Sequence, residues 1–147
     1  MDTVNVRFCP LHDDVIVPVY AHEGDAGMDL RADESVSVKP FERKLVPCGF
    51  SLAIPDGYAA YVQPRSGAAI RQGLGIINSP GLVDSNYRGE LKVAVINLDP
   101  ETPIVIERGD RIAQMVILHV PQVNLIVTNS LDETDRGDGG FGSSGMK

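Results

Sequence analysis

Short apolar runs separated by turns that contain glycine or proline recur along most of this sequence. In several runs the apolar residues alternate with others, which places them on one face of a β-strand; Leu91, Val93 and Val95 share a face in this way. With 15 Gly and 10 Pro, the chain has little room for long helices. The pattern predicts an all-β sandwich or jelly roll with strands at residues 4–8, 36–38, 43–47, 50–54, 59–63, 91–98, 104–106, 113–119 and 125–128.

Two turn signals lie close together within residues 78–95. Residues 79–81 are Ser-Pro-Gly and residues 84–86 are Asp-Ser-Asn, and both compositions supply the backbone angles that turns need. A short extended piece, 82–84, lies between the two signals, and the strand at 91–98 follows them. The segment is therefore predicted to be a β-hairpin whose tip carries Asp84, Tyr87, Arg88 and Glu90.

One short helix is predicted. Ser66 is a suitable N-cap, residues 68–72 are compatible with a helical turn, and Gly73 can end it.

The composition changes near the C-terminus. From Asp132 acidic residues come first, followed by Gly, Ser and one Phe. Such a segment cannot bury enough apolar surface to order itself. Residues 1–131 are therefore predicted to form one β-domain, and residues 132–147 a flexible arm.

Composition and charge narrow the classes of function. The 147 residues are enough for one domain with its own core. A net charge of −7 argues against general nucleic-acid binding, but a few local arginines and a metal can still meet the charge of a nucleotide. There is no transmembrane-length apolar run and no signal-peptide pattern. The isolated Cys9 and Cys48 are predicted to be buried thiols of a cytoplasmic protein, and no metal-ligand spacing connects His12, His22 and His119.

Five segments of distinctive composition follow one another along nearly the whole chain. They are A-G-M-D-L-R-A at 26–32, P-R-S-G at 64–67, G-L-V-D-S-N-Y-R-G-E at 81–90, R-G-D-R-I-A-Q at 108–114 and R-G-D-G-G-F-G-S-S-G at 136–145. In this order they resemble the five motifs of the trimeric dUTP pyrophosphatases (dUTPases). Each motif alone is a weak signal, but five in the family's order are a specific one.

The resemblance implies a single-domain jelly-roll-like (β-clip) fold and a homotrimer whose active sites are shared between subunits. It also implies Mg²⁺-assisted hydrolysis of dUTP to dUMP and pyrophosphate by in-line attack of water on the α-phosphorus. That reaction keeps uracil out of DNA and supplies dUMP for thymidylate synthesis. Residues 112–120 are apolar on both alternating faces apart from Gln114 and His119, which agrees with an oligomer because such a strand buries surface beyond its own core.

Asp84 is the candidate for activating the water, because a carboxylate within hydrogen-bond reach can accept a proton. The resemblance implies the same role, and the alternative is a turn residue that bonds its own backbone. Arg65, Ser66 and Gly67 suit phosphates through a charged fork, a hydroxyl and close backbone approach. Gln114 is polar within an apolar strand; it is either a satisfied amide or, as the resemblance implies, a phosphate ligand.

The hairpin is the candidate site for the base and sugar. Uracil presents an N–H donor between two carbonyl acceptors, which the backbone of Leu82 and Val83 can match together with the Asn78 amide. The resemblance implies that Tyr87 stacks on deoxyribose and excludes a 2′-hydroxyl, whereas the alternative is an aromatic residue packed on the sheet. The resemblance also places Lys92 among the substrate-binding residues.

Asp29 lies next to a turn that contains Gly27. It either caps that turn or, as the resemblance implies, holds Mg²⁺ through water, which fits the reluctance of magnesium to lose its hydration shell. No cage made only of protein ligands is expected, because the phosphates would supply the other ligands.

The arm is predicted to complete the site. Arg136 would act on the γ-phosphate as an arginine finger, and Phe141 would stack on the base. The glycines around Phe141, together with Gly142 and Ser143 of the fifth motif, would wrap backbone N–H groups around phosphate oxygens. Asp138 adds negative charge and is predicted to point outward. The alternative is a passive, disordered terminus.

Two other functions compete with this interpretation. A dCTP deaminase would share the fold and bind a similar nucleotide, but it would release ammonia rather than pyrophosphate. A non-catalytic binding or regulatory module of the same fold is argued against by the presence of Asp84, Arg65 and Arg136.

Overall fold

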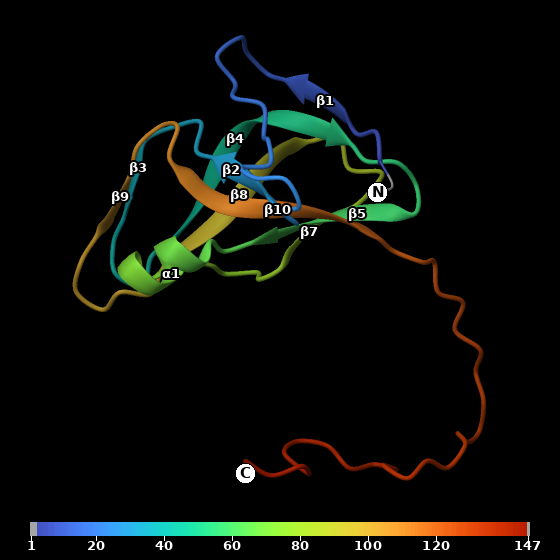
Figure 1. The fold of residues 1–147 in the computed structure, drawn as a ribbon. Helices are drawn as coiled ribbons and strands as arrows, with labels where there is room; N and C mark the ends of the chain where they lie inside the picture. The colour runs from blue at the N-terminus through green and yellow to red at the C-terminus, as the bar shows by residue number, and fades with distance from the viewer. Residues whose placement is uncertain (1–2, 147) are drawn as a thin grey trace.

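Strands dominate the structure, which is a computed structural model that describes residues 3–146. Within this range the elements are β1 (Arg7–Pro10), β2 (Met28–Arg31), β3 (Val36–Val38), β4 (Arg43–Ala53), β5 (Tyr58–Gln63), α1 (Ser66–Gln72), β6 (Leu74–Ile76), β7 (Gly81–Val83), β8 (Glu90–Asn97), β9 (Ile104–Ile106) and β10 (Arg111–His119). The predicted all-β class with one short helix is confirmed (Figure 1).

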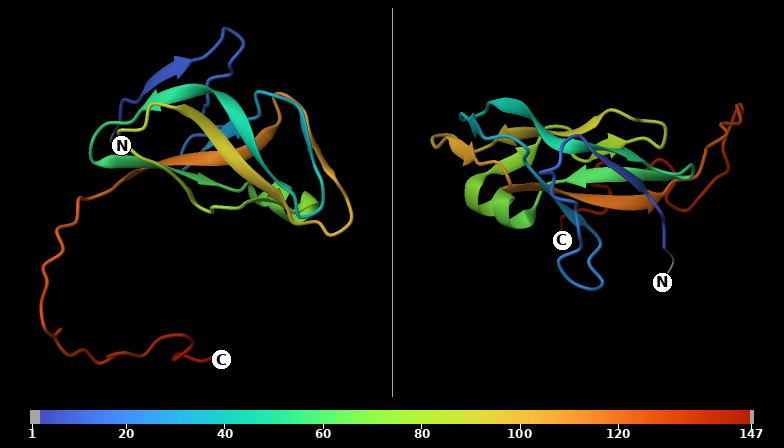
Figure 2. Two further views of the ribbon diagram at one scale, coloured as in Figure 1. Left: turned by 180° about the vertical axis from the view of Figure 1, so that it is seen from behind. Right: turned by 90° about the horizontal axis from the view of Figure 1, so that it is seen from above.

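Two four-stranded sheets form the body, in the orders β1-β4-β8-β6 and β2-β10-β5-β7, while β3 and β9 pair separately (Figures 1 and 2). Their apolar faces contribute to one core, with Leu30 from one sheet and Phe50 from the other both fully buried. On β8, Leu91, Val93 and Val95 are buried, which confirms their predicted common face. Burial of these alternating side chains is the main force that holds the two sheets together.

The strands predicted at 43–47 and 50–54 are one continuous strand, β4. Its pairing with β8 shifts register between Pro47 and Ser51, and Gly49 has a φ of +79°, which together mark a β-bulge. A Cβ at Gly49 would lie 2.7 Å from Asp33 Oδ2, so glycine is required there both sterically and conformationally. The prediction of two strands was wrong because Gly49 bends the strand without ending it.

The hairpin predicted within residues 78–95 is also wrong. β7 pairs with β5 in one sheet, and β8 pairs with β4 and β6 in the other. The loop 84–89 therefore crosses between the two sheets instead of joining two paired strands. The turn residues predicted the chain reversal correctly, but the partner of each strand depends on segments far away in the sequence.

Three smaller differences concern short or terminal strands. β2 and β6 were not predicted, since each is very short and adjoins glycine. The first strand lies at residues 7–10 and not at 4–8. Residues 125–128 form no strand, because no neighbouring segment of the described chain pairs with them.

Helix α1 has nearly the predicted extent but a different N-cap. The N-cap residue is Arg65, with an extended φ/ψ of −88°/127° and no side-chain capping bond, and Ser66 is the first helical residue. At the other end Gly73 has a φ of 70°, and its N–H points at the carbonyl oxygens of Ala68 and Ala69, which confirms the predicted glycine stop. The Ser66 hydroxyl is consequently not used to cap the helix.

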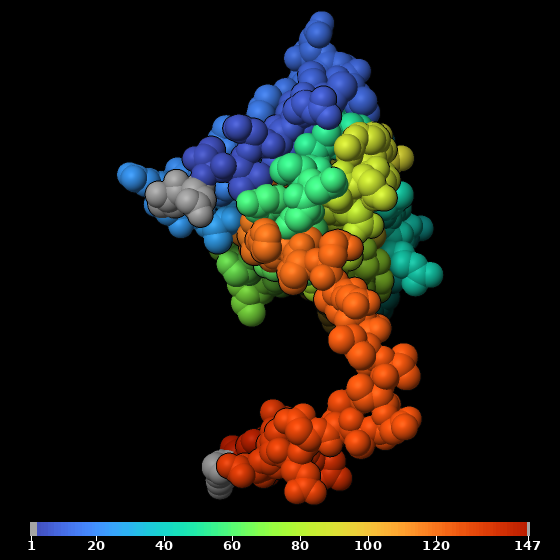
Figure 3. Space-filling model, turned by 90° about the vertical axis from the view of Figure 1, so that its right-hand side faces the viewer, coloured from blue at the N-terminus to red at the C-terminus, as the bar shows by residue number. Residues whose placement is uncertain are grey.

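After β10 the chain leaves the sandwich and curls away from it (Figures 1 and 3). No strand or helix forms between residues 120 and 146. Apolar side chains of this segment are largely exposed, with Val123 at 76% and Val127 at 95%. Among the described residues, no helix has the length and apolar character needed to cross a membrane.

The two cysteines occupy different environments. Cys48 is buried in the core as predicted, whereas the prediction of burial is wrong for Cys9, which is exposed on the edge strand β1. Burial, and to a smaller extent the negative charges of Glu90 and Asp33, raise the pKa of the Cys48 thiol to about 12.

We expect Cys48 to resist thiol reagents as long as the protein is folded. In a Cys9→Ser variant Cys48 is the only thiol, and with a pKa of about 12 only roughly one thiol in 10⁴ is ionised near pH 8. Titration with a chromogenic disulfide should therefore show no rapid reaction until denaturant is added. Rapid reaction in the native protein would contradict this burial.

Candidate functional site

Strand pairing brings the first, second and fourth motifs together. β10 lies between β2 and β5, so Gln114 has Asp29 on one side and Gln63 on the other. Pro64 and Arg65 follow Gln63 directly in the chain. Gln114 Nε2 donates a hydrogen bond of 2.9 Å to the Pro64 carbonyl oxygen. This bond ties the fourth motif to the start of the second.

Asp29 is held between two arginines. Arg65 Nε donates to Asp29 Oδ1 at 2.7 Å, and Arg111 Nη1 lies 3.3 Å from Asp29 Oδ2. The Asp29 side chain is only 23% exposed, so solvent screens these contacts less than it screens surface ion pairs. Asp29 therefore orients two guanidinium groups instead of capping the neighbouring turn.

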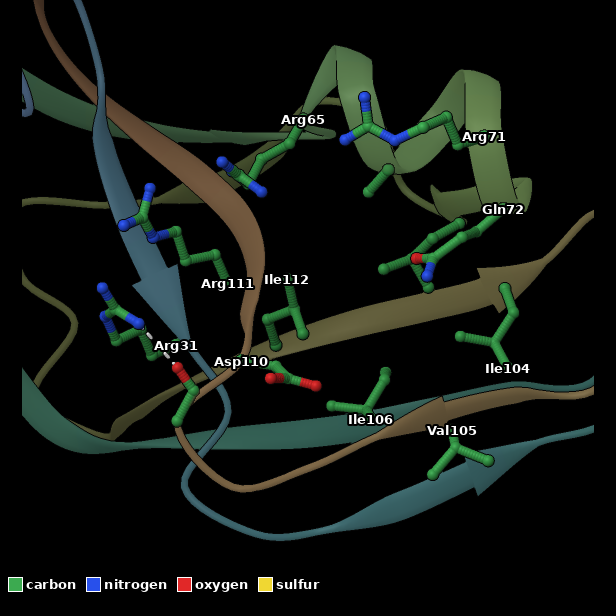
Figure 4. A pocket seen from close by; sticks show the side chains of 13 residues that line it. Arg31, Arg65, Arg71, Gln72, Ile104, Val105, Ile106, Asp110, Arg111 and Ile112 are labelled. Atoms are coloured by element: carbon green, nitrogen blue, oxygen red, sulfur yellow. Dashed lines mark hydrogen bonds between the residues drawn. The ribbon is translucent and has the colours of Figure 1, made fainter.

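Four arginines, Arg31, Arg65, Arg71 and Arg111, line a pocket of about 460 Å³ beside α1 (Figure 4). Asp110 also lines it, and Asp29 pairs with two of the arginines, but the balance of charge remains positive. A concentration of positive charge within a chain of net charge −7 is the expected feature of a local anion site.

The loop 107–110 of the fourth motif is held by bonds to β2 and to the segment after it. Arg31 Nη1 donates to the Gly109 carbonyl oxygen at 2.8 Å. Asp33 lies 3.3 Å from Arg108 Nη2 and 2.7 Å from His12 Nε2. Burial would raise the pKa of Asp33, but the hydrogen bonds from His12 and Arg108 and their charges outweigh it and lower that pKa.

Asp84 follows the end of β7 and is exposed. Its backbone oxygen accepts from the Tyr87 N–H at 3.1 Å, but its carboxylate makes no hydrogen bond within residues 3–146. It lines a pocket of about 550 Å³ together with Asp56, Gly57 and Tyr58. The carboxylate is thus available to a ligand or a water, and the alternative of a turn residue bonding its own backbone finds no support.

Tyr87 lies over the loop that joins β7 to β8. Its hydroxyl donates to the Glu90 carbonyl oxygen at 2.9 Å, and its ring covers Gly89, where a Cβ would collide with it. Glu90 Oε1 accepts from the Gly49 N–H at 3.1 Å, and Glu90 Oε2 lies 3.9 Å from Lys92 Nζ. The ring is therefore fixed in orientation, although Tyr87 as a whole is 46% exposed.

β7 is an edge strand, since it pairs only with β5. The backbone N–H and C=O groups on its other side consequently lack a strand partner within the described chain. The Asn78 amide lies close to the start of β7, because its Nδ2 would be 3.5 Å from a Cβ placed on Gly81. The backbone groups of Leu82 and Val83 point to opposite sides of β7, so one of these residues directs its N–H and C=O to the free edge.

The structure places Asp84 and Arg65 at opposite ends of β5. Val83 is opposite Ala60, so Asp84 lies beside the start of β5, whereas Arg65 lies just beyond its end. At 3.3 Å per residue this separation amounts to about 20 Å. A water bound to Asp84 must come within roughly 3.5 Å of the phosphorus that it attacks. One chain therefore does not bring these two groups to the same phosphate.

The predicted arm residues do not join either group. The segment lies away from the sandwich, Arg136 Nε donates to the Gly139 carbonyl oxygen of its own loop at 2.8 Å, and Phe141 is fully exposed (Figure 1). Gly142 and Ser143 belong to the same exposed loop.

No cluster of three or more potential metal ligands occurs among the described residues. Asp29, the predicted magnesium contact, is already paired with two arginines. A carboxylate in this position suits an indirect contact through water better than direct coordination, because its oxygens are already engaged.

Arg31, Arg71 and Arg111 line the pocket beside α1 but were not predicted as site residues. Arg31 and Arg111 lie within the first and fourth motifs, and Arg71 lies four residues after Gly67. That helical spacing was the only available signal for Arg71, because residues four apart share a face of a helix.

Comparison with known proteins shows what class of protein has this fold and site. The dUTPase family model matches residues 13–145. The deoxyuridine 5′-triphosphate nucleotidohydrolase of Thermobifida fusca is 50% identical over 143 residues, covering 97% of this chain and 80% of that protein. The enzyme of the same name from Mycobacterium marinum is 55% identical over 134 residues, covering 88% and 87%.

A solved structure extends the likeness to three dimensions. The dUTPase of Staphylococcus bacteriophage 80alpha, solved with dUPNHPP, matches with a TM-score of 0.88 and 28% identity over 97% of this chain and 99% of that one. Fold and sequence together define a nucleotide hydrolase of the all-β jelly-roll class. More narrowly, the chain belongs to the dUTPase family, which confirms the resemblance drawn from the five motifs.

The bonds to Asp33 lead to a pH-dependent prediction. Because the pKa of Asp33 is lowered on folding, its contribution to stability is present above the unfolded value and is lost as pH falls through the folded value, below 3.8. Asp33→Asn should destabilise the protein by about 1–2 kcal/mol at neutral pH, and the difference from wild type should shrink towards pH 3. Urea unfolding at both pH values measures it.

The control for this experiment is Asp14→Asn, in the same exposed segment as His12 but without a hydrogen bond in the described structure. It should leave stability unchanged at either pH. A constant difference between Asp33→Asn and wild type across this range would contradict the role of the charged carboxylate.

Proposed function

We propose that this chain, a dUTP diphosphatase, hydrolyses dUTP to dUMP and pyrophosphate through in-line attack of water on the α-phosphorus, with Asp84 as the group that orients and deprotonates the water. The new bond joins the water oxygen to the α-phosphorus, and the bond to the β-phosphate oxygen breaks. The observation that carries this role is the exposed Asp84 carboxylate, which lines a pocket and makes no bond to its own backbone.

The triphosphate would bind at the turn before α1. Arg65 offers the guanidinium hydrogens that Asp29 does not engage, and the Ser66 hydroxyl is not used as a cap. Gly67 lets the backbone approach an anion closely. Gln114 donates one of its two amide hydrogens to the Pro64 carbonyl oxygen, which leaves the other for a phosphate oxygen.

The base would pair with the free edge of β7. The backbone N–H and C=O that Leu82 or Val83 directs to this edge, together with the Asn78 amide, can match the donor and acceptors of uracil. Cytosine reverses two of these groups and would leave buried partners unpaired, which is strongly unfavourable. Tyr87 would stack on the deoxyribose. Lys92, near the start of β8, would also contact the substrate.

Magnesium would be held by the triphosphate and, through water, by Asp29. When bound, the ion would neutralise phosphate charge and hold the triphosphate in one conformation. Asp29 is the one carboxylate assigned to the ion, and it is held in place by Arg65 and Arg111. Its position next to the proposed phosphate turn is what supports the assignment.

The complete site would require more than one copy of the chain. In one chain, Asp84 and Arg65 lie about 20 Å apart at the two ends of β5. A second copy could instead bring its own Arg65 turn to the Asp84 pocket of the first. This supports sites shared between copies, and the family resemblance implies that three copies form a homotrimer. The exposed apolar segment around residues 123–127 is compatible with contacts to another copy.

The arm, proposed to comprise residues 132–147 beyond a domain of residues 1–131, would close over bound nucleotide. Arg136 would reach the γ-phosphate, Phe141 would cover the base, and the backbone around Gly142 and Ser143 would meet phosphate oxygens. The exposure of Phe141, and the course of the described part of the arm away from the sandwich (Figure 1), leave these groups available.

In the cell, the proposed reaction would keep uracil out of DNA and supply dUMP for thymidylate synthesis. Free thiols at both Cys9 and Cys48 are consistent with a cytoplasmic location.

The central test of this function is Asp84→Asn. This variant should bind a non-hydrolysable dUTP analogue normally but lose about 10²–10⁴ in kcat, because the amide cannot accept the proton. Pyrophosphate and ammonia should be measured separately, with dUTP and dCTP as substrates. Asp56→Asn, which changes another carboxylate of the same pocket, is the matched control and should keep near-normal turnover. Normal kcat in Asp84→Asn, or ammonia release by wild type, would overturn the proposal.

Removal of the arm tests the lid separately. A chain that ends after Leu131 should keep its thermal stability and oligomeric state, because the removed segment buries almost nothing. It should lose much of its activity, since arginine fingers contribute roughly 10³–10⁵ in rate. In the full chain, a non-hydrolysable dUTP analogue should protect the arm from protease. Equal digestion with and without the analogue, or full activity after truncation, would show that the arm is passive.

A further inference from the structure

The pocket beside α1 holds more positive charge than the three residues of the second motif explain. Besides Arg65 it is lined by Arg31, Arg71 and Arg111, and it extends along α1 past Gln72 (Figure 4). Arg65 and Arg111 are engaged by Asp29, and Arg31 is bonded to the Gly109 carbonyl oxygen. The Arg71 side chain makes no hydrogen bond or ion pair within residues 3–146.

The position of Arg71 follows from helix geometry. In a helix each side chain leans towards the N-terminus and lies on the same face as the residue four positions earlier, which for Arg71 is Gly67. A Cβ placed on Gly67 would lie 2.7 Å from Arg71 Nη2 and 3.3 Å from Arg71 Cζ. The guanidinium of Arg71 therefore lies in the space that the missing side chain of Gly67 leaves open.

This placement brings Arg71 back over the turn proposed to bind phosphate. Its guanidinium extends from the last turn of α1 towards Arg65 (Figure 4). Two like charges that converge on one pocket repel each other, so the arrangement is favourable only when water or an anion lies between them. A planar guanidinium without a protein partner presents five donors that match phosphate oxygens.

We propose that Arg71 is a further substrate-binding residue, whose guanidinium contacts the β- and γ-phosphates of dUTP and stabilises the pyrophosphate as it leaves. This inference rests on the proposed function, which brings the triphosphate to Arg65, Ser66 and Gly67. The nucleoside enters from the Asp84 side of the shared site, so the terminal phosphates are the part that reaches the pocket along α1. Gly67 then has two functions, since it exposes its own backbone and makes room for Arg71.

The test compares ligands with and without the terminal phosphates. Arg71→Gln should weaken binding of a non-hydrolysable dUTP analogue about 10- to 100-fold, as expected for loss of charged hydrogen bonds, while the affinity for dUMP stays within twofold. The value of kcat/KM for dUTP should fall by a similar factor. Arg71→Lys, which keeps the charge but not the fork, should recover part of the loss. Arg7→Gln removes an exposed arginine on the edge strand β1 and should change neither affinity.

Other outcomes would overturn the inference. Equal weakening of dUMP and the dUTP analogue would mean that Arg71 only supports the shape of α1, and no change in either would mean that it meets no phosphate. A changed oligomeric mass of Arg71→Gln, measured by light scattering, would assign Arg71 to a contact between copies instead. Failure of the proposed function itself is distinguishable, because wild type would then release no pyrophosphate from dUTP.

Discussion

The antiparallel pairing of β5 with β10 on one side and β7 on the other is the constraint on which the rest of the site depends. On one side of β5, β10 carries Gln114 and pairs with β2, which carries Asp29. The turn after β5, which we propose binds phosphate, is therefore held by neighbours in the sheet. The β7 side of β5 leads to Asp84 at the other end of the strand. β5 therefore fixes which residues lie together at each of its ends, and its length fixes the distance between Asp84 and Arg65.

Charge is distributed in accordance with this division. The half proposed to bind phosphate concentrates arginines around Asp29 in a chain of net charge −7, an arrangement that favours an anion in one pocket. The other half leaves the Asp84 carboxylate exposed and unbonded, next to an open strand edge. We propose that the arginine pocket supplies most of the binding energy and that the β7 edge recognises the base. Because these two regions lie far apart in one chain, catalysis would require copies to assemble.

Features that depend only on neighbouring residues were predictable from the sequence, whereas features that depend on distant segments were not. The alternation of Leu91, Val93 and Val95 and the glycine stop at Gly73 are local, and both were predicted correctly. The hairpin failed because turn residues indicate a reversal but not the partner of a strand, and β4 was divided because a bulge at Gly49 resembles a turn. The pocket that Arg71 lines is formed by distant segments, and its helical spacing from Gly67 was the only local signal for this placement.

The claim that Asp84 and Arg65 act in one site from different copies is tested most directly by mixing two inactive variants. Asp84→Asn and Arg65→Gln should each be nearly inactive alone. After joint unfolding and refolding, random assembly into closed rings should restore activity to about a quarter of the sites, because some sites then combine an intact Asp84 with an intact Arg65. If assemblies shown by two affinity tags to contain both variants remain as inactive as their parents, the two groups do not act together across copies.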